Sequence, residues 1–306
     1  MAILLTRRLL QALGVLFGVA VITFLLLHFL PAYPAALVAG RSANAQTIAN
    51  VRHQLGLDLP LPEQFWRYLT GLLQGNLGRS YIQRSPVMTL IVARIPATLV
   101  LMACGIAVEV AIGLTFGVIA AIRRNGFVDR TVMTLAFVGV SAPQFVIALL
   151  LLYVFAARLG WFPMSGYGTP AHVALPALTL GLLGAGWYAR MTRSAMIDVL
   201  NQDYVRTARA KGLSATRVLL RHALPNALLP IVAMIGIDIG QFMGGVVVVE
   251  AVYGWPGIGQ LAWQAIQQVD VPIIMGVTLV SSLAIVLGNL IADMVAPWLD
   301  PRIRIR

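Results

Sequence analysis

The chain has 306 residues, of which 59% are hydrophobic and only 11% are charged, and its mean hydropathy is +0.85. Soluble domains carry about 25% charged residues, so this composition excludes an ordinary water-soluble protein. It also excludes a disordered chain, because disorder requires low hydrophobicity. The single cysteine, Cys104, excludes a disulfide framework, a four-cysteine zinc site and an iron–sulfur cluster. We interpret the chain as an all-α, polytopic membrane protein.

Six apolar runs are long enough to cross a bilayer as helices, which takes about 20 residues each. In chain order they are residues 9–30, 97–122, 131–157, 173–196, 227–249 and 273–292. The first run is too long for the apolar part of a signal peptide, and the residues after it make a poor cleavage site, so we expect it to be retained. The sequence therefore predicts a single transmembrane domain over residues 1–306, with six spans.

The basic residues are unevenly distributed among the loops. Lys and Arg number 22 against 11 Asp and Glu, and most of the basic residues lie at the two termini and in the loops after the second and fourth runs. Cytoplasmic loops of membrane proteins are enriched in Lys and Arg, so both termini are predicted to be cytoplasmic and residues 31–95 to lie outside. This bias accounts for the net charge of +11 without a nucleic-acid partner.

The loop after the fourth run predicts a pair of short helices over residues 203–224. Asp203 can cap the first helix, Gly212 can adopt the left-handed turn that ends it, and Ser214 can cap the second. Pro225 would stop that helix or pass the chain on to the fifth run. Such a cationic pair can rest on anionic lipid heads, or it can be a knob that a cytosolic protein grips. The spacing alone does not decide between these two interpretations.

Small residues recur at intervals of four in the fifth run, at Gly236, Gly240 and Gly244, with Gly245 beside them. A stripe without side chains lets another helix approach closely. The partner helix can belong to the same chain, or it can lie across a subunit interface around a transport pathway. In the third run, Pro143 is predicted to kink the helix.

Three acids lie at or near membrane depth: Glu109, Asp238 and Glu250. Such residues are costly in a bilayer and usually face a bundle interior or a watery cavity. Asp238 is the most central, and a hydrogen bond to a neighbouring helix is favoured over a proton- or ion-coupling role.

Two segments outside the predicted spans have recognisable patterns. Residues 63–73 predict a short amphipathic helix with aromatic residues at the membrane interface. Residues 251–259 contain three glycines and a proline, which predict a tight turn before the short helix 260–268. This second segment can be a gate over an outer vestibule or simply a capped loop.

Several kinds of catalytic chemistry are absent from the sequence. Lys211 is the only lysine and does not stand in a Gly-Lys-Ser/Thr motif, so the chain has no P-loop for ATP. The four histidines are scattered, and Ser141 has no buried histidine placed to act as its base. We expect the chain to be no enzyme and to hold neither a metal nor a cofactor.

The segment Asp203–Ser214, followed by residues 222–230, resembles the cytoplasmic loop of binding-protein-dependent ABC importer permeases, and more narrowly the dipeptide/oligopeptide/nickel branch. Gly212 and the Leu224-Pro225 pair match that loop. Further segments that resemble this branch are residues 55–58, 77–80, 244–250, 255–259 and 299–304. The departures are Pro31-Ala32-Tyr33-Pro34 in place of Pro-Gly-Asp-Pro, Arg206-Thr207-Ala208 in place of Glu-Ala-Ala, and Pro225 in place of an Arg.

The resemblance implies a type I ABC importer permease fold in a bacterial inner membrane. It also implies a second homologous permease, forming a heterodimer, two cytosolic ATPase subunits that bind ATP and Mg²⁺, and a substrate-binding protein outside. In alternating access, residues 203–224 would be the coupling helices that the ATPases grip. The residues implied in coupling are Asp203, Tyr204, Arg206, Ala208, Arg209, Lys211, Gly212 and Leu213. Those implied in the outer gate and docking surface are Tyr253, Trp255, Pro256 and Gly257.

Relatives in this branch carry dipeptides, oligopeptides, glutathione or nickel chelates. The chain has no His, Cys and carboxylate cluster suited to bare nickel, which favours a peptide, with glutathione as one candidate. The alternatives are a nickel-chelate permease of the same branch, an ion-coupled secondary carrier with Asp238 or Glu109 as the relay, and a structural membrane anchor.

Overall fold

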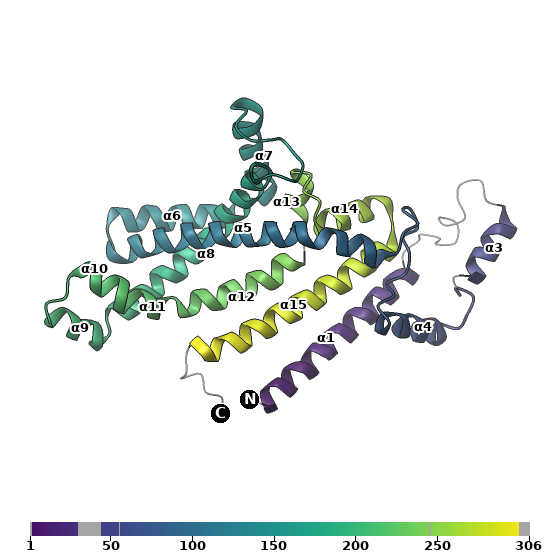
Figure 1. Ribbon diagram of the computed structural model, residues 1–306, viewed down its shortest axis with the longest axis horizontal. Helices are drawn as coiled ribbons and strands as arrows, with labels where there is room; N and C mark the ends of the chain where they lie inside the picture. Colours follow the sequence, from purple (N-terminus) through teal and green to yellow (C-terminus); the bar gives the residue numbers. More distant parts are fainter. Residues whose placement is uncertain (1, 30–43, 55, 245, 300–306) are drawn as a thin grey trace. The chain divides into compact units, whose positions relative to one another are not determined.

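A computed structural model describes residues 2–29, 44–54, 56–244 and 246–299 (Figure 1). The described residues form helices and no strands, apart from one isolated bridge between Arg79 and Pro86. The elements are α1 (Ala2–Phe29), α3 (Ala45–Gln54), α4 (Leu61–Leu73), α5 (Val87–Ile122), α6 (Phe127–Ser141), α7 (Gln144–Leu151), the π-helix η1 (Leu152–Arg158), α8 (Pro170–Leu200), α9 (Asp203–Ala210), α10 (Ala215–Arg217), the π-helix η2 (Val218–Ala223), α11 (Leu224–Ala227), α12 (Leu229–Met243), α13 (Val247–Val252), α14 (Ile258–Gln268) and α15 (Val271–Leu299). The all-α prediction is confirmed.

The chain forms two compact units. Unit 1 contains residues 1–98, 244–247 and 256–286, and unit 2 contains residues 99–243, 248–255 and 287–306.

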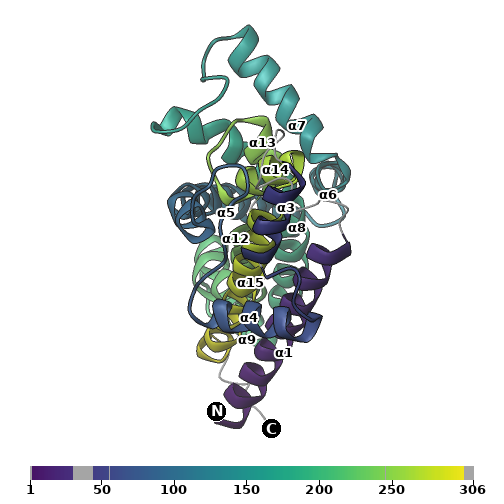
Figure 2. The same cartoon turned by 90° about the vertical axis from the view of Figure 1, so that its right-hand side faces the viewer.

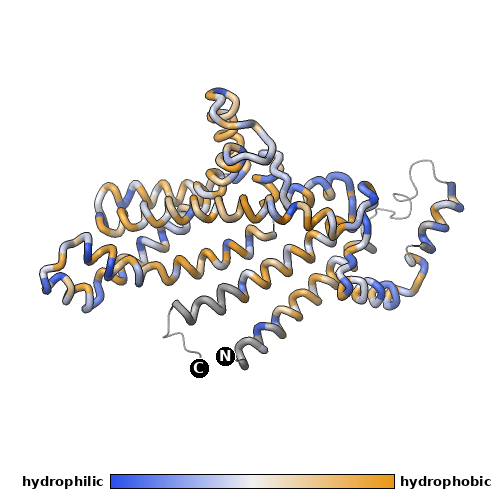
Figure 3. Tube along the Cα trace, viewed as in Figure 1, coloured by the Kyte–Doolittle hydropathy of each residue, from blue (hydrophilic) through white to orange (hydrophobic). Residues whose placement is uncertain are grey.

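Two described helices are long and apolar enough to span a membrane by themselves, Val87–Ile122 and Val271–Leu290. Two bent pairs qualify when each pair is taken together, Phe127–Ser141 with Gln144–Arg158, and Ala215–Ala227 with Leu229–Met243. A shorter apolar stretch, Leu10–Leu26, lies in α1. The predicted total of six spans stays a prediction. Figure 3 displays the apolar character of these helices as orange segments.

The third apolar run is interrupted rather than merely kinked. α6 and α7 meet at an angle of 102° (Figures 1 and 2). Ala142, the residue before Pro143, is extended with ψ at 133°. A proline disfavours helical geometry in the preceding residue, so helix α6 ends there and a new helix begins after Pro143. The predicted change of direction at Pro143 is confirmed, although the helix breaks there instead of bending, and one span over residues 131–157 stays a prediction.

The fifth run is also shorter than predicted. α12 ends at Met243, Gly244 lies in a turn, and α13 begins at Val247, so residues 227–249 do not form one helix. Consecutive glycines favour a break because glycine loses more conformational freedom in a helix than any other residue. The predictions that rest on Gly245, on residues 31–34 and on residues 300–304 fall outside the described residues.

Unit 1 is built around an apolar cluster contributed by α5, α14 and α15. Its buried members are Val87, Ile91, Ile258, Leu261, Ala265, Ile273 and Val277. Gly276 makes this packing close, because a methyl group there would lie 2.5 Å from a methyl carbon of Val87. The helix α14 confirms the short helix predicted after the glycine-rich turn.

Asp270 joins two loops of unit 1. Its carboxylate accepts hydrogen bonds from the Ser80 hydroxyl and from the backbone N–H groups of Tyr81 and Ile82, both at 3.2 Å. The Asp270 side chain is fully buried, and three donors satisfy its oxygens. Burial and the neighbouring Asp270 charge raise the pKa of Tyr81 to about 12, so that phenol stays protonated.

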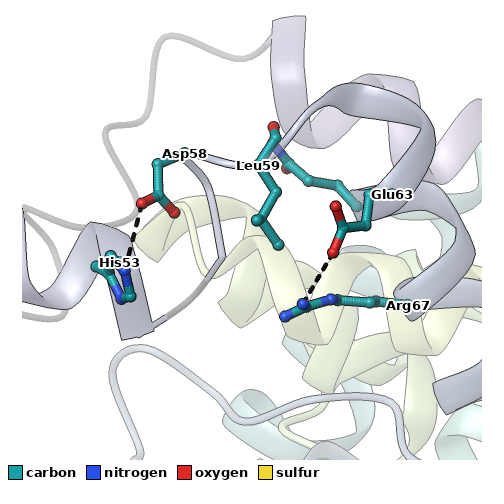
Figure 4. A network of polar contacts seen from close by, with 6 residues as sticks. His53, Asp58, Leu59, Glu63 and Arg67 are labelled. Carbon is teal, nitrogen blue, oxygen red and sulfur yellow. Dashed lines mark hydrogen bonds and ion pairs between the residues drawn. The ribbon is translucent and has the colours of Figure 1, made fainter.

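α4 confirms the amphipathic helix predicted for the segment between the first two runs. Its inner face packs on α1, where the ring of Phe65 meets Phe24 edge to face and the Tyr68 hydroxyl lies 2.9 Å from the Thr23 hydroxyl. Trp66 on the other face is 65% exposed. Exposed ion pairs flank the start of this helix, His53 with Asp58 at 3.8 Å and Glu63 with Arg67 at 2.9 Å (Figure 4).

Unit 2 is organised around α8, and glycines allow α5 and α6 to approach it. A methyl group on Gly113 would lie 2.2 Å from Cβ of Tyr188, and one on Gly186 would lie 2.4 Å from the carbonyl oxygen of Ala136. At one end of the same helices, the Arg193 guanidinium donates two hydrogen bonds to Asp129, at 2.6 and 2.7 Å. Close glycine contacts and this ion pair together fix α6 against α8.

Candidate functional site

The predicted pair of short helices forms a hairpin with its own small core in unit 2. We call residues 203–223, comprising α9, α10 and η2, the basic hairpin. Val205, Ala208 and Val218 are buried against one another, with Leu213 and the end of α8 packed around them. The hairpin is therefore a folded element and not an extended loop.

Gly212 has the predicted left-handed conformation, with φ at +76°. The chain turns back there because the N–H of Gly212 bonds to the carbonyl of Arg209 at 2.9 Å and the N–H of Leu213 bonds to that of Ala208 at 3.4 Å. A methyl group on Gly212 would meet nothing within 4 Å. The turn thus requires glycine for its backbone geometry and not for lack of space.

One predicted helix cap is displaced by a residue, and the other has the predicted position without a capping bond. α9 starts at Asp203 itself, and the preceding Gln202 takes the cap position without a side-chain hydrogen bond. Asp203 instead forms an exposed pair with Arg206 at 3.6 Å. Ser214 does occupy the cap position of α10, but its side chain makes no capping bond. The buried core and the Gly212 turn, rather than side-chain caps, hold the hairpin together.

The residues predicted for coupling divide into an exposed face and a buried base. Tyr204, Arg206, Arg209, Lys211 and Gly212 are exposed, whereas Ala208 is buried and Leu213 is half-buried. The hydrophilic character of α9 stands out in Figure 3. The exposed face can contact a partner, and the buried base can pass the resulting motion to the helices beneath.

The hairpin is tied to the long helices of unit 2 through a second buried cluster. Ala223 and Ala227 pack against Met196 of α8 and Ala121 of α5. Pro225 lies in the first turn of α11, where a proline is tolerated, and so passes the chain on toward α12. The base of the hairpin is therefore packed against both α5 and α8.

Two of the predicted membrane-depth acids lie near each other in unit 2. The Tyr188 hydroxyl donates a hydrogen bond to Asp238, which confirms the predicted bond from Asp238 to a neighbouring helix. Glu109 of α5 is only 3% exposed and lines the same cavity as Asp238. The third acid, Glu250, is fully buried in α13.

The glycines of the fifth run serve packing within the chain. A methyl group on Gly288 of α15 would lie 2.8 Å from Cα of Gly240. Gly236 is also buried on α12, while Gly244 lies beyond the end of that helix. Of the two interpretations of this stripe, the contact at Gly240 supports packing inside one chain.

Side chains predicted to form an outer docking surface are buried. Tyr253 and Trp255 are 2% and 1% exposed within unit 2. The Tyr253 hydroxyl donates to the carbonyl of Ala148 at 3.0 Å and lies 2.8 Å from the Thr179 hydroxyl, and Trp255 packs edge to face on Tyr167. Hydrogen bonding and packing therefore use these two side chains inside the unit, and their role in an outer gate or docking surface stays a prediction. In unit 1, Gly257 is buried and Pro256 is half-buried.

Sequence reasoning missed the Asp129–Arg193 pair. Arg193 was visible as a charge that interrupts the fourth apolar run, and Asp129 as an acid in the loop before the third. Two opposite charges next to predicted spans were the signal, but their separation of 64 residues in sequence hid the contact. No group of three or more His, Cys, Asp or Glu residues suited to a metal ion occurs in the described part of the chain.

These features define a polytopic helical membrane protein with a basic, folded hairpin anchored to its long helices. The chain belongs to the binding-protein-dependent transport system inner membrane component family, whose model matches residues 113–305. The N-terminal model of such membrane components matches residues 1–102. The chain is thus a permease subunit of an ABC importer, a multi-pass protein of the inner membrane.

Curated relatives match almost the whole chain. The glutathione transport system permease protein GsiC of Pectobacterium atrosepticum is 45% identical over 97% of each chain. GsiC of Salmonella typhimurium is 46% identical and GsiC of Escherichia coli K12 is 45% identical, with the same coverage.

Solved structures support the same fold. Two inward-facing crystal forms of the MetNI methionine ABC transporter match with TM-scores of 0.58 and 0.59, at 23% and 21% identity. Each match covers 69% of this chain and 97% of the other. The type I ABC importer permease fold expected from the sequence is confirmed.

Proposed function

We propose that this permease moves peptides into the cell by alternating access, and that glutathione is one of its substrates. The GsiC relatives are named for glutathione transport and match nearly the full chain. The observation that carries the coupling part is the basic hairpin, with an exposed cationic face over a buried base fixed to α5 and α8.

The hairpin would be gripped by cytosolic ATPase subunits, which would carry ATP and Mg²⁺. Closure of the ATPases would push the hairpin, and the cluster of Met196, Ala121 and Ala223 would pass that motion to the long helices. A second homologous permease would complete the transport pathway, and a binding protein outside would deliver the substrate. Both termini would then be cytoplasmic, with six spans between them.

Substitution of Gly212 tests the coupling role. Gly212→Val forces a β-branched residue into a left-handed conformation, which costs about 1–2 kcal/mol or more and should distort the turn. We expect the complex to assemble in the membrane but to lose ATP-driven uptake in proteoliposomes. Gly212→Asn is the matched control, because asparagine tolerates this conformation and the position has open space. Normal uptake by the Gly212→Val complex would overturn the assignment.

The energy source separates this proposal from an ion-coupled carrier. That alternative is considered because Glu109 and Asp238 could act as a proton relay. The reconstituted importer complex should take up labelled glutathione only with ATP on the ATPase side, and a protonophore should not slow it. Uptake driven by a proton gradient without ATP would favour the carrier. A nickel-chelate substrate would be favoured if glutathione and dipeptides both failed to compete with the chelate.

A further inference from the structure

A polar cavity lies among α5, α8 and α12 within unit 2. It has a volume of about 280 Å³ and is lined in part by Glu109, Tyr188 and Asp238, with Gln241 and the exposed Trp187. This volume is just below the range of about 300–1,000 Å³ for ligand sites, so the cavity can take one end of a peptide but not a whole one. It is open rather than sealed, which gives a ligand access.

Glu109 lines the cavity with an incompletely satisfied carboxyl group. Its side chain is 3% exposed, and its Oε2 atom has no hydrogen-bond partner among the described residues. Gly184 makes room for it, because a methyl group there would lie 2.0 Å from Oε1 of Glu109. A buried carboxyl oxygen without a partner is costly, so this oxygen is available to a hydrogen-bond donor that enters the cavity.

Asp238 adds a second carboxyl group to the same cavity. One of its oxygens accepts the hydrogen bond from Tyr188, which orients the group. None of the described residues that line the cavity is basic. The nearby Arg190 guanidinium stacks on the Trp187 ring, 4.3 Å from its centroid. The described lining of the cavity therefore contains two carboxyl groups and no basic side chain to pair with them.

We propose that Glu109 and Asp238 form a subsite that binds the ammonium group at one end of a peptide during transport. Two carboxylates in a partly desolvated site repel each other, and a cation placed between them relieves both the repulsion and the cost of burial. An ammonium group has three donors, enough for the free oxygen of Glu109 and for Asp238. This inference rests on the proposed function, the import of peptides.

The contact between the ammonium group and Glu109 is isolated by comparing two substrates, with and without that group, in the wild-type and the variant importer. We would reconstitute the complete importer in proteoliposomes and measure kcat/KM for uptake of glutathione and of N-acetylglutathione, which lacks the ammonium group. The binding protein is the same in every assay, so its own preference cancels in the ratio between variant and wild type. Glu109→Gln should lower kcat/KM for glutathione by roughly tenfold or more and leave N-acetylglutathione within about twofold.

Control variants keep the result interpretable. Glu63→Gln removes the same charge from an exposed surface pair and should leave kcat/KM unchanged for both substrates. If Glu109→Gln fails to assemble, Asp238→Asn is measured in the same way, with the same expected difference between the substrates. The substitutions Glu109→Gln and Asp238→Asn are near-isosteric, so we expect each to preserve the packing of the helices.

Two outcomes would overturn the subsite. One is an equal loss for both substrates, which a structural role or a proton relay would produce, and the other is no change for either. Failure of the proposed function has a different signature: the wild-type complex would hydrolyse ATP but transport neither glutathione nor any dipeptide.

Discussion

The basic hairpin and the packed helices of unit 2 use charged side chains in opposite ways. On the hairpin, the side chain of Arg206 is 79% exposed, and its ion pair with Asp203 is a loose one at 3.6 Å. Between α6 and α8, the side chain of Asp129 is 4% exposed and is held by two short hydrogen bonds from Arg193. Exposed charges are hydrated and free to meet a partner, whereas buried charges are costly unless they are paired.

The difference predicts that the same kind of substitution has unlike consequences in the two regions. Removing one partner of a buried ion pair should destabilise the fold, and removing an exposed charge should leave the fold intact and weaken only association with a partner. Each of the following predictions tests that contrast.

The largest effect is expected at the ion pair between α6 and α8. Asp129→Ala leaves the partly buried Arg193 without its partner, which should lower the free energy of unfolding by about 3–5 kcal/mol. Denaturant-induced unfolding of the purified complex in mixed micelles would measure this change in free energy. The double variant Asp129→Ala with Arg193→Leu should recover much of the loss, because no unpaired charge remains. If the double variant is no more stable than the single one, the pair is not the source of the effect.

A smaller effect is expected in the core of the hairpin. Val205→Ala removes two carbons from a fully buried side chain, at a cost of about 2 kcal/mol. Hydrogen exchange over residues 203–223 should show faster local opening, while the long helices stay protected. Thr216→Ala at an exposed hairpin position is the control and should not change exchange by a comparable amount. Unchanged exchange in Val205→Ala would mean that the hairpin lacks a cooperative core.

The smallest effect on stability is expected on the exposed face. Arg206→Gln should change the free energy of unfolding by less than about 0.5 kcal/mol. It should nevertheless weaken binding of the ATPase subunits, and the difference from wild type should shrink as salt is raised. Arg52→Gln in α3, also exposed, should leave ATPase binding unchanged. Equal ATPase binding by wild type and Arg206→Gln at low salt would exclude this face from the contact.

Local patterns in the sequence predicted the elements whose geometry is set within a few residues. The turn at Gly212 was predictable because a left-handed residue at a helix end favours glycine. The amphipathic helix α4 followed from its alternating faces, and the all-α class followed from the length of the apolar runs. Helix boundaries were less accurate: the helix breaks at Pro143, and α12 ends at Met243, before the turn at Gly244.

The sequence by itself determined the class of this protein, its resemblance to a family of importer permeases and the existence of the basic hairpin. Only the tertiary structure decided which polar groups meet. Asp129 and Arg193 are 64 residues apart in the chain, and Tyr188 and Asp238 are 50 apart. It also placed Tyr253 and Trp255 inside. Composition and periodicity record which face of a helix is apolar, but the partner across that face depends on the packing of distant helices, which no local pattern encodes.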